Sequence, residues 1–422
     1  MLRLRLFILQ FVILLFVLPV YALDVNQDIR NEQLVVSALP EEAINNGPKT
    51  VLDYSQNELA VEAVKKNVTL FTEKIREKFS FWLSRSGKYI DLMKEILKQK
   101  DVPEEIVFLA LIESGFNPYA YSPARAVGYW QFIASTAKRY GLEINWWKDE
   151  RRDPEKSTVA AANYLKDLYE MFGSWNLAMA AYNAGEGKIL KALNRTKTDD
   201  YWALLKTSQI RSETKNYVPK FIAASMIANS PQNFGFEDIE YYPPLNYDRV
   251  AIKSPLDLEV IAACAETTEG VIKELNPELR RWCTPPDVSE YIVRVPDGKK
   301  DIFLKNLSNI PEEKRFTVEI YKVKKGDTFK TISKKTGVPV QVVLDLNSLE
   351  KIIPLKAGTK IYLPPKGKFV LDRDDRPAIK KVSLKYKKKA LVKDRKSGTR
   401  KAIKKASFKR NKKALKTKDR KI

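Results

Sequence analysis

Histidine is absent from the 422-residue chain, and cysteine occurs only twice. The absence of histidine excludes Ser-His-Asp and Cys-His nucleophilic systems, histidine metal sites and histidine acid–base catalysis. Catalysis would therefore fall to carboxylates, hydroxyls, amides, lysine or arginine, and we expect neither a metal nor a cofactor. Two cysteines are too few for a structural zinc site, and their spacing does not fit a CxxC redox motif.

The two cysteines, Cys264 and Cys283, leave two alternatives open. In an oxidising compartment they are a candidate disulfide that closes a loop of about 20 residues and contributes ~3 kcal/mol in the chain-entropy model. The other alternative is a pair of unbonded, buried thiols.

Long apolar runs are also scarce. One run of 15 residues, Leu6–Val20, follows Arg3 and Arg5 and precedes Ala22. It is short for a membrane span, and a small residue at its end suits a signal peptidase. We predict a signal peptide over residues 1–22 and export to the periplasm or cell envelope, with an uncleaved N-terminal anchor as the alternative. No lipidation cysteine lies near this junction.

Acidic residues are rare at the C-terminus, where residues 366–422 hold 25 Lys/Arg against 5 Asp/Glu. This segment accounts for +20 of the net charge of +23, so the remainder of the chain is nearly neutral. A segment with so few apolar residues is expected to be disordered, and we predict a basic disordered tail over 367–422. The predicted partners are anionic envelope polymers or lipid. A nucleic-acid partner is disfavoured by the export signal, and a solvated extension without a partner is the alternative.

Between these ends the hydrophobic pattern changes twice. Residues 23–60 lack periodicity and are predicted to be a poorly ordered leader. Residues 61–235 have apolar positions at three- and four-residue steps, which predicts a mainly α-helical domain. Residues 236–312 are predicted to be a linker that contains a degenerate small module. Residues 313–366 are predicted to be a second module.

The evidence for the degenerate module is an internal repeat. Residues 261–276 align without a gap on residues 332–347, at a constant offset of 71 positions. Both segments begin with Ile and end with Leu-Asn, although few other positions are identical. The pattern favours a repeated small module of the kind found in surface-binding proteins.

A single glutamate has the best sequence context for chemistry. Seven apolar residues, 106–112, precede Glu113 and predict a helix buried on nearly all faces, while Gly115 predicts its end. Asp101 is predicted to be the N-cap of this helix, with Glu104 as its capping partner. At the C-terminal end of a buried helix, desolvation and the helix dipole both raise the pKa of Glu113, as a general acid requires.

Two later motifs carry side chains suited to sugar recognition. Residues 128–131, Gly-Tyr-Trp-Gln, combine a flexible glycine, two aromatic rings and an amide, and residues 181–185, Ala-Tyr-Asn-Ala-Gly, add a phenol and a second amide. Aromatic rings stack on sugars and amides bond to their hydroxyls. Taken alone, each motif is equally consistent with core packing.

In this order and spacing, the Glu113-Ser114 pair and the two motifs resemble those of lytic transglycosylases with a goose-type-lysozyme-like catalytic domain. The resemblance implies that Glu113 is the catalytic acid/base and that Tyr217 orients it. Arg125 stands where members of the family commonly have glycine. The resemblance further implies a group of substrate-binding residues: Ser114, Ser122, Tyr129, Gln131, Tyr182, Asn183 and Tyr217.

Residues 316–365 are similar to a LysM domain, a small βααβ fold. The resemblance implies a glycan-binding groove at Gly326, Asp327 and Thr328 and near Asn347. The predicted fold is therefore a mainly α lysozyme-like domain, followed by small α+β LysM-type modules and the basic tail. The implied partner is the peptidoglycan glycan strand.

The resemblance also implies a reaction, in which one glutamate cleaves the bond between N-acetylmuramic acid and N-acetylglucosamine and leaves a 1,6-anhydro end. Ordinary glycosidases need two carboxylates, so a hydrolytic muramidase on the same fold is the first alternative. A non-catalytic wall-binding scaffold is the second. The candidates for a second carboxylate are Asp149, Glu150, Asp153, Glu186 and Glu213, although the segment 149–154 is read mainly as a charge network and helix N-cap.

Overall fold

The computed structural model describes residues 57–368. The predictions for the signal peptide, for most of the leader and for the basic tail lie outside these residues. Among the described helices, none combines the length and the apolar character that a membrane crossing requires.

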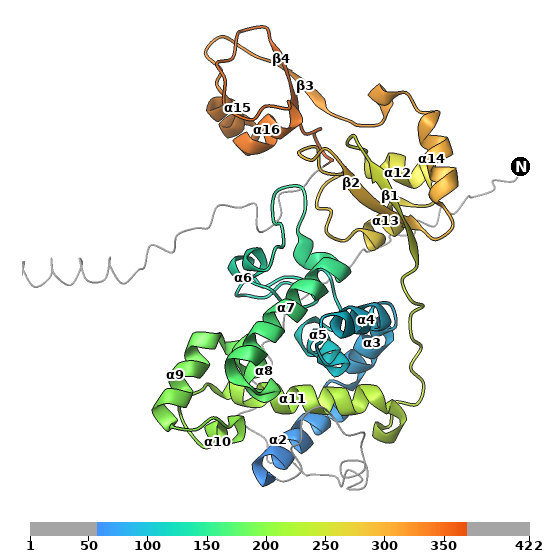
Figure 1. The fold of residues 1–422 in the computed structure, drawn as a ribbon. Helices are drawn as coiled ribbons and strands as arrows, with labels where there is room; N and C mark the ends of the chain where they lie inside the picture. Colours follow the sequence, from blue (N-terminus) through green and yellow to red (C-terminus); the bar gives the residue numbers. More distant parts are fainter. Residues whose placement is uncertain (1–56, 369–422) are drawn as a thin grey trace, which may run out of the picture. The chain divides into compact units, whose positions relative to one another are not determined.

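The first part of the described chain is helical, as predicted (Figure 1). Its longest helix, α7, begins where Asp153 caps the backbone N–H groups of Glu155 and Lys156 and where Pro154 occupies the first turn. It ends at Gly173, whose φ of +64° is left-handed. The helices are α2 (Glu58–Thr69), α3 (Arg76–Ser86), α4 (Ile90–Gln99), α5 (Phe108–Ser114), α6 (Ala134–Arg139), α7 (Pro154–Phe172), α8 (Trp175–Ala184), α9 (Glu186–Thr196), α10 (Tyr201–Leu205) and α11 (Ser212–Asn229).

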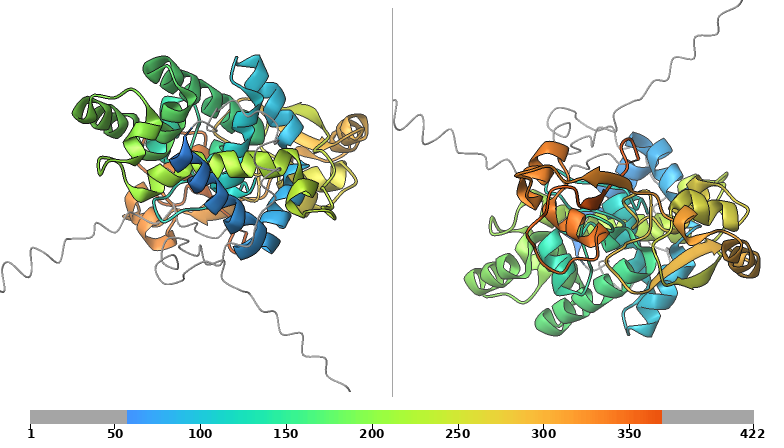
Figure 2. Two further views of the ribbon diagram at one scale, coloured as in Figure 1. Left: turned by 90° about the horizontal axis from the view of Figure 1, so that it is seen from below. Right: turned by 90° about the horizontal axis from the view of Figure 1, so that it is seen from above.

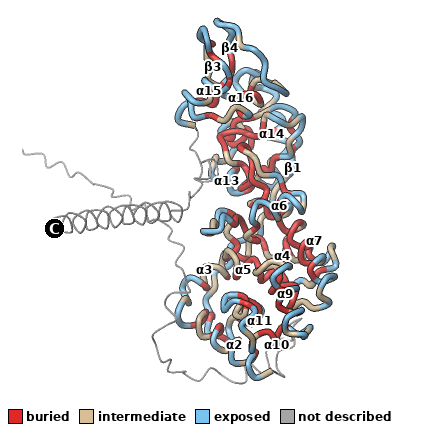
Figure 3. Tube along the Cα trace, turned by 90° about the vertical axis from the view of Figure 1, so that its left-hand side faces the viewer, coloured by how far each residue is buried: buried red, intermediate tan, exposed pale blue. Residues whose placement is uncertain are grey.

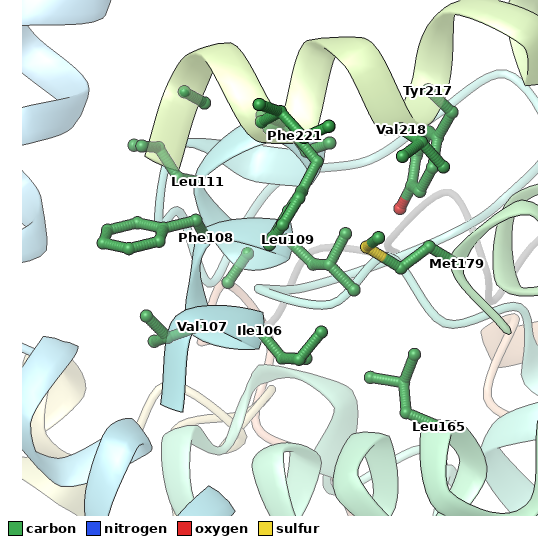
Figure 4. Packing of buried hydrophobic residues seen from close by; sticks show 14 of the residues in the cluster. Ile106, Val107, Phe108, Leu109, Leu111, Leu165, Met179, Tyr217, Val218 and Phe221 are labelled. Atoms are coloured by element: carbon green, nitrogen blue, oxygen red, sulfur yellow. The ribbon is translucent and has the colours of Figure 1, made fainter. Parts of the chain in front are cut away.

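Helix α5 lies inside this domain. The five residues from Phe108 to Ile112 are buried, and α11 packs against α5, α2 and α8 (Figures 1 and 2). Figure 4 shows Phe221 of α11 directed toward Leu109 of α5, with Met179 of α8 beside them. Each fully buried side chain of this size contributes about 1.5–3 kcal/mol. Buried residues therefore concentrate around α5, while the outer turns are exposed (Figure 3).

The start of α5 differs from the prediction. Residues 104–107 form a 3-10 turn before α5, and Pro103 precedes that turn. Asp101 has a left-handed φ of +56° and its carboxylate pairs with Lys166 at 3.1 Å, so it does not cap the helix. The N-cap rule fails here because Asp101 belongs to the preceding turn, where its short polar side chain tolerates positive φ.

Two small modules follow the helical domain, and each is built as strand, helix, helix, strand. In each module the two strands pair antiparallel, Tyr247 opposite Pro296 in the first and Glu319 opposite Leu363 in the second. The elements of the first are β1 (Tyr247–Ile252), α12 (Leu258–Cys264), α13 (Glu269–Leu275) and β2 (Tyr291–Pro296), followed by α14 (Lys300–Ser308); those of the second are β3 (Glu319–Lys322), α15 (Phe329–Thr336), α16 (Val340–Leu346) and β4 (Lys360–Leu363).

The repeat predicted from the offset of 71 is visible in matching hydrogen bonds. Asn276 donates from Nδ2 to Ile272 O at 2.9 Å and to Arg294 O at 2.8 Å, and its Oδ1 accepts from Arg294 N at 2.8 Å. Asn347 makes the same three bonds to Val343 O, Tyr362 O and Tyr362 N. In both modules this asparagine ties the second helix to the last strand. Asn347 thus uses its amide inside its own module.

Asp327, predicted to bind glycan, also serves its own turn. Its buried carboxylate accepts hydrogen bonds from Tyr321 Oη at 2.7 Å, Lys324 N at 2.9 Å and Lys335 Nζ at 2.7 Å. The Lys335 ammonium group and the other two donors lower the pKa of Asp327 to about 2. These three bonds hold the turn in place, and a role of Asp327 in glycan binding stays a prediction.

The two cysteines are free and buried, so the disulfide predicted as one alternative is absent. Cys283 pairs across a β-bridge with Asp257, immediately before α12, whereas Cys264 is the last residue of α12. Seven helical residues span about 10 Å, which exceeds the Cα separation of about 7 Å that a disulfide tolerates.

Candidate active site

Glu113 occupies the last turn of α5, and Gly115 ends the helix with a φ of +59°. A Cβ at Gly115 would lie 2.3 Å from the Trp82 ring, so the glycine is required both by its conformation and by space. Glu113 is half-buried, and its Oε1 accepts a hydrogen bond from Tyr217 Oη of α11 at 2.5 Å. The predicted pairing of glutamate and late tyrosine is present in the geometry.

Burial raises the pKa of Glu113 above its usual value, as predicted from its place at a buried helix end. The hydrogen bond from Tyr217 and the charge of Lys220 oppose this shift, while the charge of Glu213 adds to it. Burial and the neighbouring Glu113 keep the pKa of Tyr217 well above its usual value, so the phenol remains a donor. Glu113 thus retains its proton to higher pH than an exposed glutamate.

The residues after Glu113 hold the 128–131 turn beside it. Ser114 Oγ lies 2.8 Å from Tyr129 O and 3.1 Å from Ala110 O, and it accepts from Asn117 N at 3.2 Å. From the other side, Tyr182 Oη donates to Trp130 O at 2.7 Å. Ser114 and Tyr182 therefore hold the turn through its backbone carbonyl groups. The motif-based prediction assigned these side chains to sugar binding and did not include this structural role.

Tyr129, which was predicted to bind substrate, lies in the core of the helical domain. Its ring is fully buried and packs edge-on against Tyr89 with centroids 4.9 Å apart. The Trp130 ring is equally buried, with Nε1 donating to Thr158 Oγ1 at 2.9 Å. Both rings are packed in the core, so neither offers an exposed face to a sugar.

Gln131 and Ser122 are half-buried. Gln131 has a φ of +49°, and its Nε2 donates to Gly128 O at 2.8 Å. Ser122 Oγ accepts from Ala126 N at 3.0 Å and closes the loop that contains Arg125. Arg125 adopts a φ of +64°, the conformation that glycine takes without strain. The arginine thus retains the backbone geometry of a glycine position.

The loop that precedes α7, residues 149–153, is in contact with the 128–131 turn. A Cβ at Gly128 would lie 1.9 Å from Arg151 O, so the loop and the turn are in direct backbone contact. The Arg151 guanidinium pairs with Asp149 and donates to Arg125 O at 3.2 Å and Phe132 O at 3.1 Å. The prediction that segment 149–154 is mainly a charge network and helix cap is confirmed.

Sequence reasoning missed a buried ion cluster that ties this loop to the first module. Arg294 of β2 reaches Asp153 at 2.6 Å and Glu278 at 3.3 Å, and all three residues are buried. Glu278 O also accepts from Asp149 N at 2.8 Å. Burial and the charge of Asp153 raise the pKa of Glu278 to about 7, although Arg294 opposes this shift. No local sequence pattern connects positions 141 residues apart.

Replacing Tyr217 by Phe is expected to move the pH profile of the reaction. The phenol stabilises the ionised carboxylate, so its removal raises the pKa of Glu113 further. The high-pH limb of kcat, where the acid form is lost, should therefore shift upward. The measurement is kcat against pH on a soluble glycan. Tyr201→Phe is the control, because that phenol donates only to Thr214 O and Lys215 O; equal profiles for both variants would contradict the assignment.

Comparison with known families agrees with this geometry. The Transglycosylase SLT domain matches residues 92–205, the LysM-like domain of lytic transglycosylase MltD matches 246–312, and the LysM domain matches 321–364. The matched ranges include Glu113, the segments 128–131 and 181–185, and the two repeated modules.

Individual proteins are also similar to this chain in sequence. Membrane-bound lytic murein transglycosylase D of Escherichia coli K12 is 31% identical over 280 residues, which cover 63% of this chain and 61% of the relative. A putative tributyltin chloride resistance protein of Alteromonas is 33% identical over 181 residues, 42% of this chain and 83% of that protein. Among solved structures, the 70 kDa soluble lytic transglycosylase of Escherichia coli is 25% identical, with a TM-score of 0.32, over 44% of this chain and 32% of that one. The chain belongs to the family defined by the transglycosylase SLT domain, here followed by LysM-like domains.

Proposed function

We propose that this protein is a lytic transglycosylase that cleaves peptidoglycan at the β-1,4 bond between N-acetylmuramic acid and N-acetylglucosamine. The observation that carries the proposal is Glu113, a carboxyl of raised pKa at the end of a buried helix, hydrogen-bonded to Tyr217. The domain matches and the transglycosylase names of the relatives support the same reaction class. The chain spans about three fifths of the length of the Escherichia coli relative, so the substrate of the present protein is proposed and not taken over from that relative.

The proposed mechanism uses Glu113 twice. In its protonated form it donates to the glycosidic oxygen as the bond to the leaving sugar breaks. The acetamido group of the substrate supports the positive charge that develops at the anomeric carbon. The Glu113 carboxylate, stabilised by the Tyr217 hydrogen bond, then removes the proton of the C6 hydroxyl, whose oxygen closes the 1,6-anhydro ring. No water is consumed.

The alternative, a hydrolytic muramidase, needs a second carboxylate near Glu113. Four of the five candidates have other roles: Asp149 pairs with Arg151, Asp153 with Arg294, Glu150 with Lys148 and Lys156, and Glu186 with Arg139. Glu213 alone among them is exposed and lies close enough to influence the pKa of Glu113. Hydrolysis therefore depends on Glu213, whereas the transglycosylase reaction does not.

The product distinguishes the two reactions. Purified sacculi are digested with the protein and the soluble fragments are analysed by mass spectrometry. We expect 1,6-anhydro ends, which are one water lighter than reducing ends. If the main product has reducing ends, and if the Glu213→Gln variant no longer forms them, the protein is a hydrolytic muramidase and the proposal is wrong.

The LysM-like module at 313–366 is proposed to hold the enzyme on glycan strands. In the loop after Asn347, Ile352 is 66% exposed and Ile353 is 40% exposed, so this loop presents apolar side chains that a glycan could contact. Thr328 caps α15 at the same turn. A module of this kind raises the effective concentration of substrate at the catalytic domain.

Removing the module should weaken binding more than catalysis. A chain ending at residue 312 is compared with one ending at 366, so that both lack the basic tail. We expect sacculus pull-down to fall at least tenfold and turnover of short soluble glycans to change less than twofold. The point variant Ile352→Ser should reproduce part of the loss, whereas Ile320→Ser, an equally exposed residue on β3, should not. Equal pull-down by both truncations would remove this role.

The proposed place of action is the cell envelope. The relative named above is described as membrane-bound, and the composition of residues 1–22 predicts export. The tail at 367–422 is proposed, from its charge alone, to contact anionic envelope polymers or lipid.

A further inference from the structure

Lys220 is a charged side chain close to Glu113 that the proposed mechanism does not use. It lies three residues after Tyr217 on α11, so both side chains project from the same face of that helix, which packs against α5. Lys220 Nζ donates a hydrogen bond to Ile112 O at 3.4 Å and so holds the backbone of the residue that precedes Glu113. Tyr217 and Lys220 thus reach the end of α5 from the same helix.

The charge of Lys220 is not neutralised by contact. Lys220 is half-buried, yet no carboxylate within residues 57–368 forms an ion pair with it. The buried cations Lys148, Arg151 and Arg294 differ, because each of them pairs directly with a carboxylate. Burial lowers the pKa of Lys220, while the charge of Glu113 raises it. The charge is therefore retained at a place where desolvation favours an uncharged side chain.

Another lysine of α11 shows what a purely structural role looks like. Lys215 is also half-buried, and its Nζ donates to the carbonyl of Leu205, the last residue of α10, at 2.8 Å. Lys215 precedes Tyr217 by two residues, a spacing that places the two side chains on different faces of a helix. Its hydrogen bond therefore supports the end of α10, whereas that of Lys220 supports the end of α5 beside Glu113.

The charged and titratable groups that face Glu113, Lys220 or the end of α5 come from three helices. They are Lys78 and Arg85 of α3, Tyr182 of α8, and Glu213 and Tyr217 of α11. Arg85 donates to Gly115 O at 3.0 Å, which anchors the turn after α5 without Lys220. The charge of Lys220 lowers the pKa of Glu113, against the effect of burial. Lys220 therefore acts on the charge state of Glu113 as well as on the backbone before it.

We propose that Lys220 is a positioning residue of the reaction, which fixes the end of α5 through Ile112 O and favours the ionised form of Glu113 between the two proton transfers. This inference rests on the proposed function, in which Glu113 first gives up a proton and then takes one from the C6 hydroxyl. Between these steps a carboxylate stands at a half-buried position, where desolvation disfavours it. A cation held near the carboxylate, but not in contact with it, offsets this cost and leaves the carboxylate free to act as the base.

The first variant, Lys220→Met, removes the charge and keeps an unbranched side chain. We expect kcat on a soluble glycan to fall about tenfold and KM to change less than about twofold, because the step in which Glu113 loses its proton becomes less favourable. The high-pH limb of kcat should move upward, since a carboxyl without its neighbouring cation keeps its proton to higher pH. Lys220→Arg keeps the charge and a donor for Ile112 O, and it should restore the pH profile of the wild type.

Two further variants separate the charge from the hydrogen bond. Lys215→Met is the matched control, because it removes a bond to a helix end from the same helix, and its pH profile should equal that of the wild type. Lys220→Gln keeps a donor without the charge, and glutamine is well tolerated in helices, so this variant also serves if Lys220→Met does not fold. Its high-pH limb should move upward as well.

The outcomes distinguish the inference from the proposed function. A wild-type pH profile in Lys220→Gln would show that the hydrogen bond alone matters and would overturn the inference. A Lys220→Arg profile no closer to the wild type than that of Lys220→Met, or equal shifts in Lys220→Met and Lys215→Met, would also overturn it. Reducing ends as the main product of the wild type would instead contradict the proposed function, and this measurement does not involve the Lys220 variants.

Discussion

Glu113→Gln is expected to lower kcat on purified sacculi by at least a thousandfold while leaving the fold and glycan binding intact. Glutamine preserves the shape of the side chain and accepts a hydrogen bond from Tyr217 through its amide oxygen, but it has no proton to donate to the glycosidic oxygen. The measurement is release of soluble fragments together with sacculus pull-down. Glu104→Gln, an exposed change nine residues earlier, is the control.

The same variant makes a second prediction about stability. Because burial raises the pKa of Glu113, the folded chain binds more protons than the unfolded chain between the ordinary pKa and the raised one. The free energy of unfolding of the wild type therefore falls as pH rises through that window, and Glu113→Gln removes this loss. In urea unfolding at pH 4 and pH 8, the free energy of unfolding of the variant relative to that of the wild type should be higher at pH 8 than at pH 4.

If Glu113→Gln releases soluble fragments from sacculi at a rate near that of the wild type, Glu113 is not the catalytic acid. A stability difference that does not change with pH would leave the rate prediction standing but would contradict the raised pKa.

The features that local sequence predicts correctly are those set by local physics. An apolar run followed by Glu113 and Gly115 predicts a buried helix and its end, because both depend on adjacent residues. The module repeat is likewise found from a fixed offset, and Asn276 and Asn347 then occupy equivalent positions. The hydrogen bond between Tyr217 and Glu113 also agrees with the prediction that this tyrosine orients the glutamate.

The direction of each side chain in an irregular turn is not predicted in the same way. Tyr129 and Gln131 are two positions apart in one motif, yet one is in the core and the other is half-buried, because the turn has no period that assigns faces. The contact between Asp153 and Arg294 depends on how two domains pack, which no window of sequence contains. The fold and the place of Glu113 at the end of a buried helix are therefore predictable from the sequence, whereas the contacts around Glu113 are not.

Arg294→Met should lower the free energy of unfolding by about 3–5 kcal/mol, because it leaves buried carboxylates without a counter-charge. Asp153 is 1% exposed and Glu278 is 3% exposed, and Arg294 donates hydrogen bonds to both. The first module is thus part of the support of the catalytic domain, since Asp153 caps α7 and the neighbouring Arg151 holds the 128–131 turn.

The loss in Arg294→Met should depend on pH. In the wild type, the pKa of Glu278 is raised to about 7, so its ionisation costs stability as pH rises from its ordinary pKa of about 4.3 toward 7. Without Arg294 that pKa rises further, and the destabilisation continues to higher pH. The deficit relative to the wild type should therefore be larger at pH 8 than at pH 5.

Urea unfolding at both pH values, with turnover of a short soluble glycan measured well below the unfolding midpoint, tests this prediction. Lys299→Met is the matched control, since it breaks an exposed pair with Glu266 and should cost less than about 1 kcal/mol. Arg294→Met should also lower kcat in the folded protein. Without Arg294, the loop that contains Asp153 and Arg151 is held less firmly. Arg151 bonds to the end of the 128–131 turn, which Ser114 and Tyr182 hold beside Glu113, so the position of that turn should become less well defined. A loss no larger than that of the control, or one equal at pH 5 and pH 8, would show that the buried cluster does not support the site.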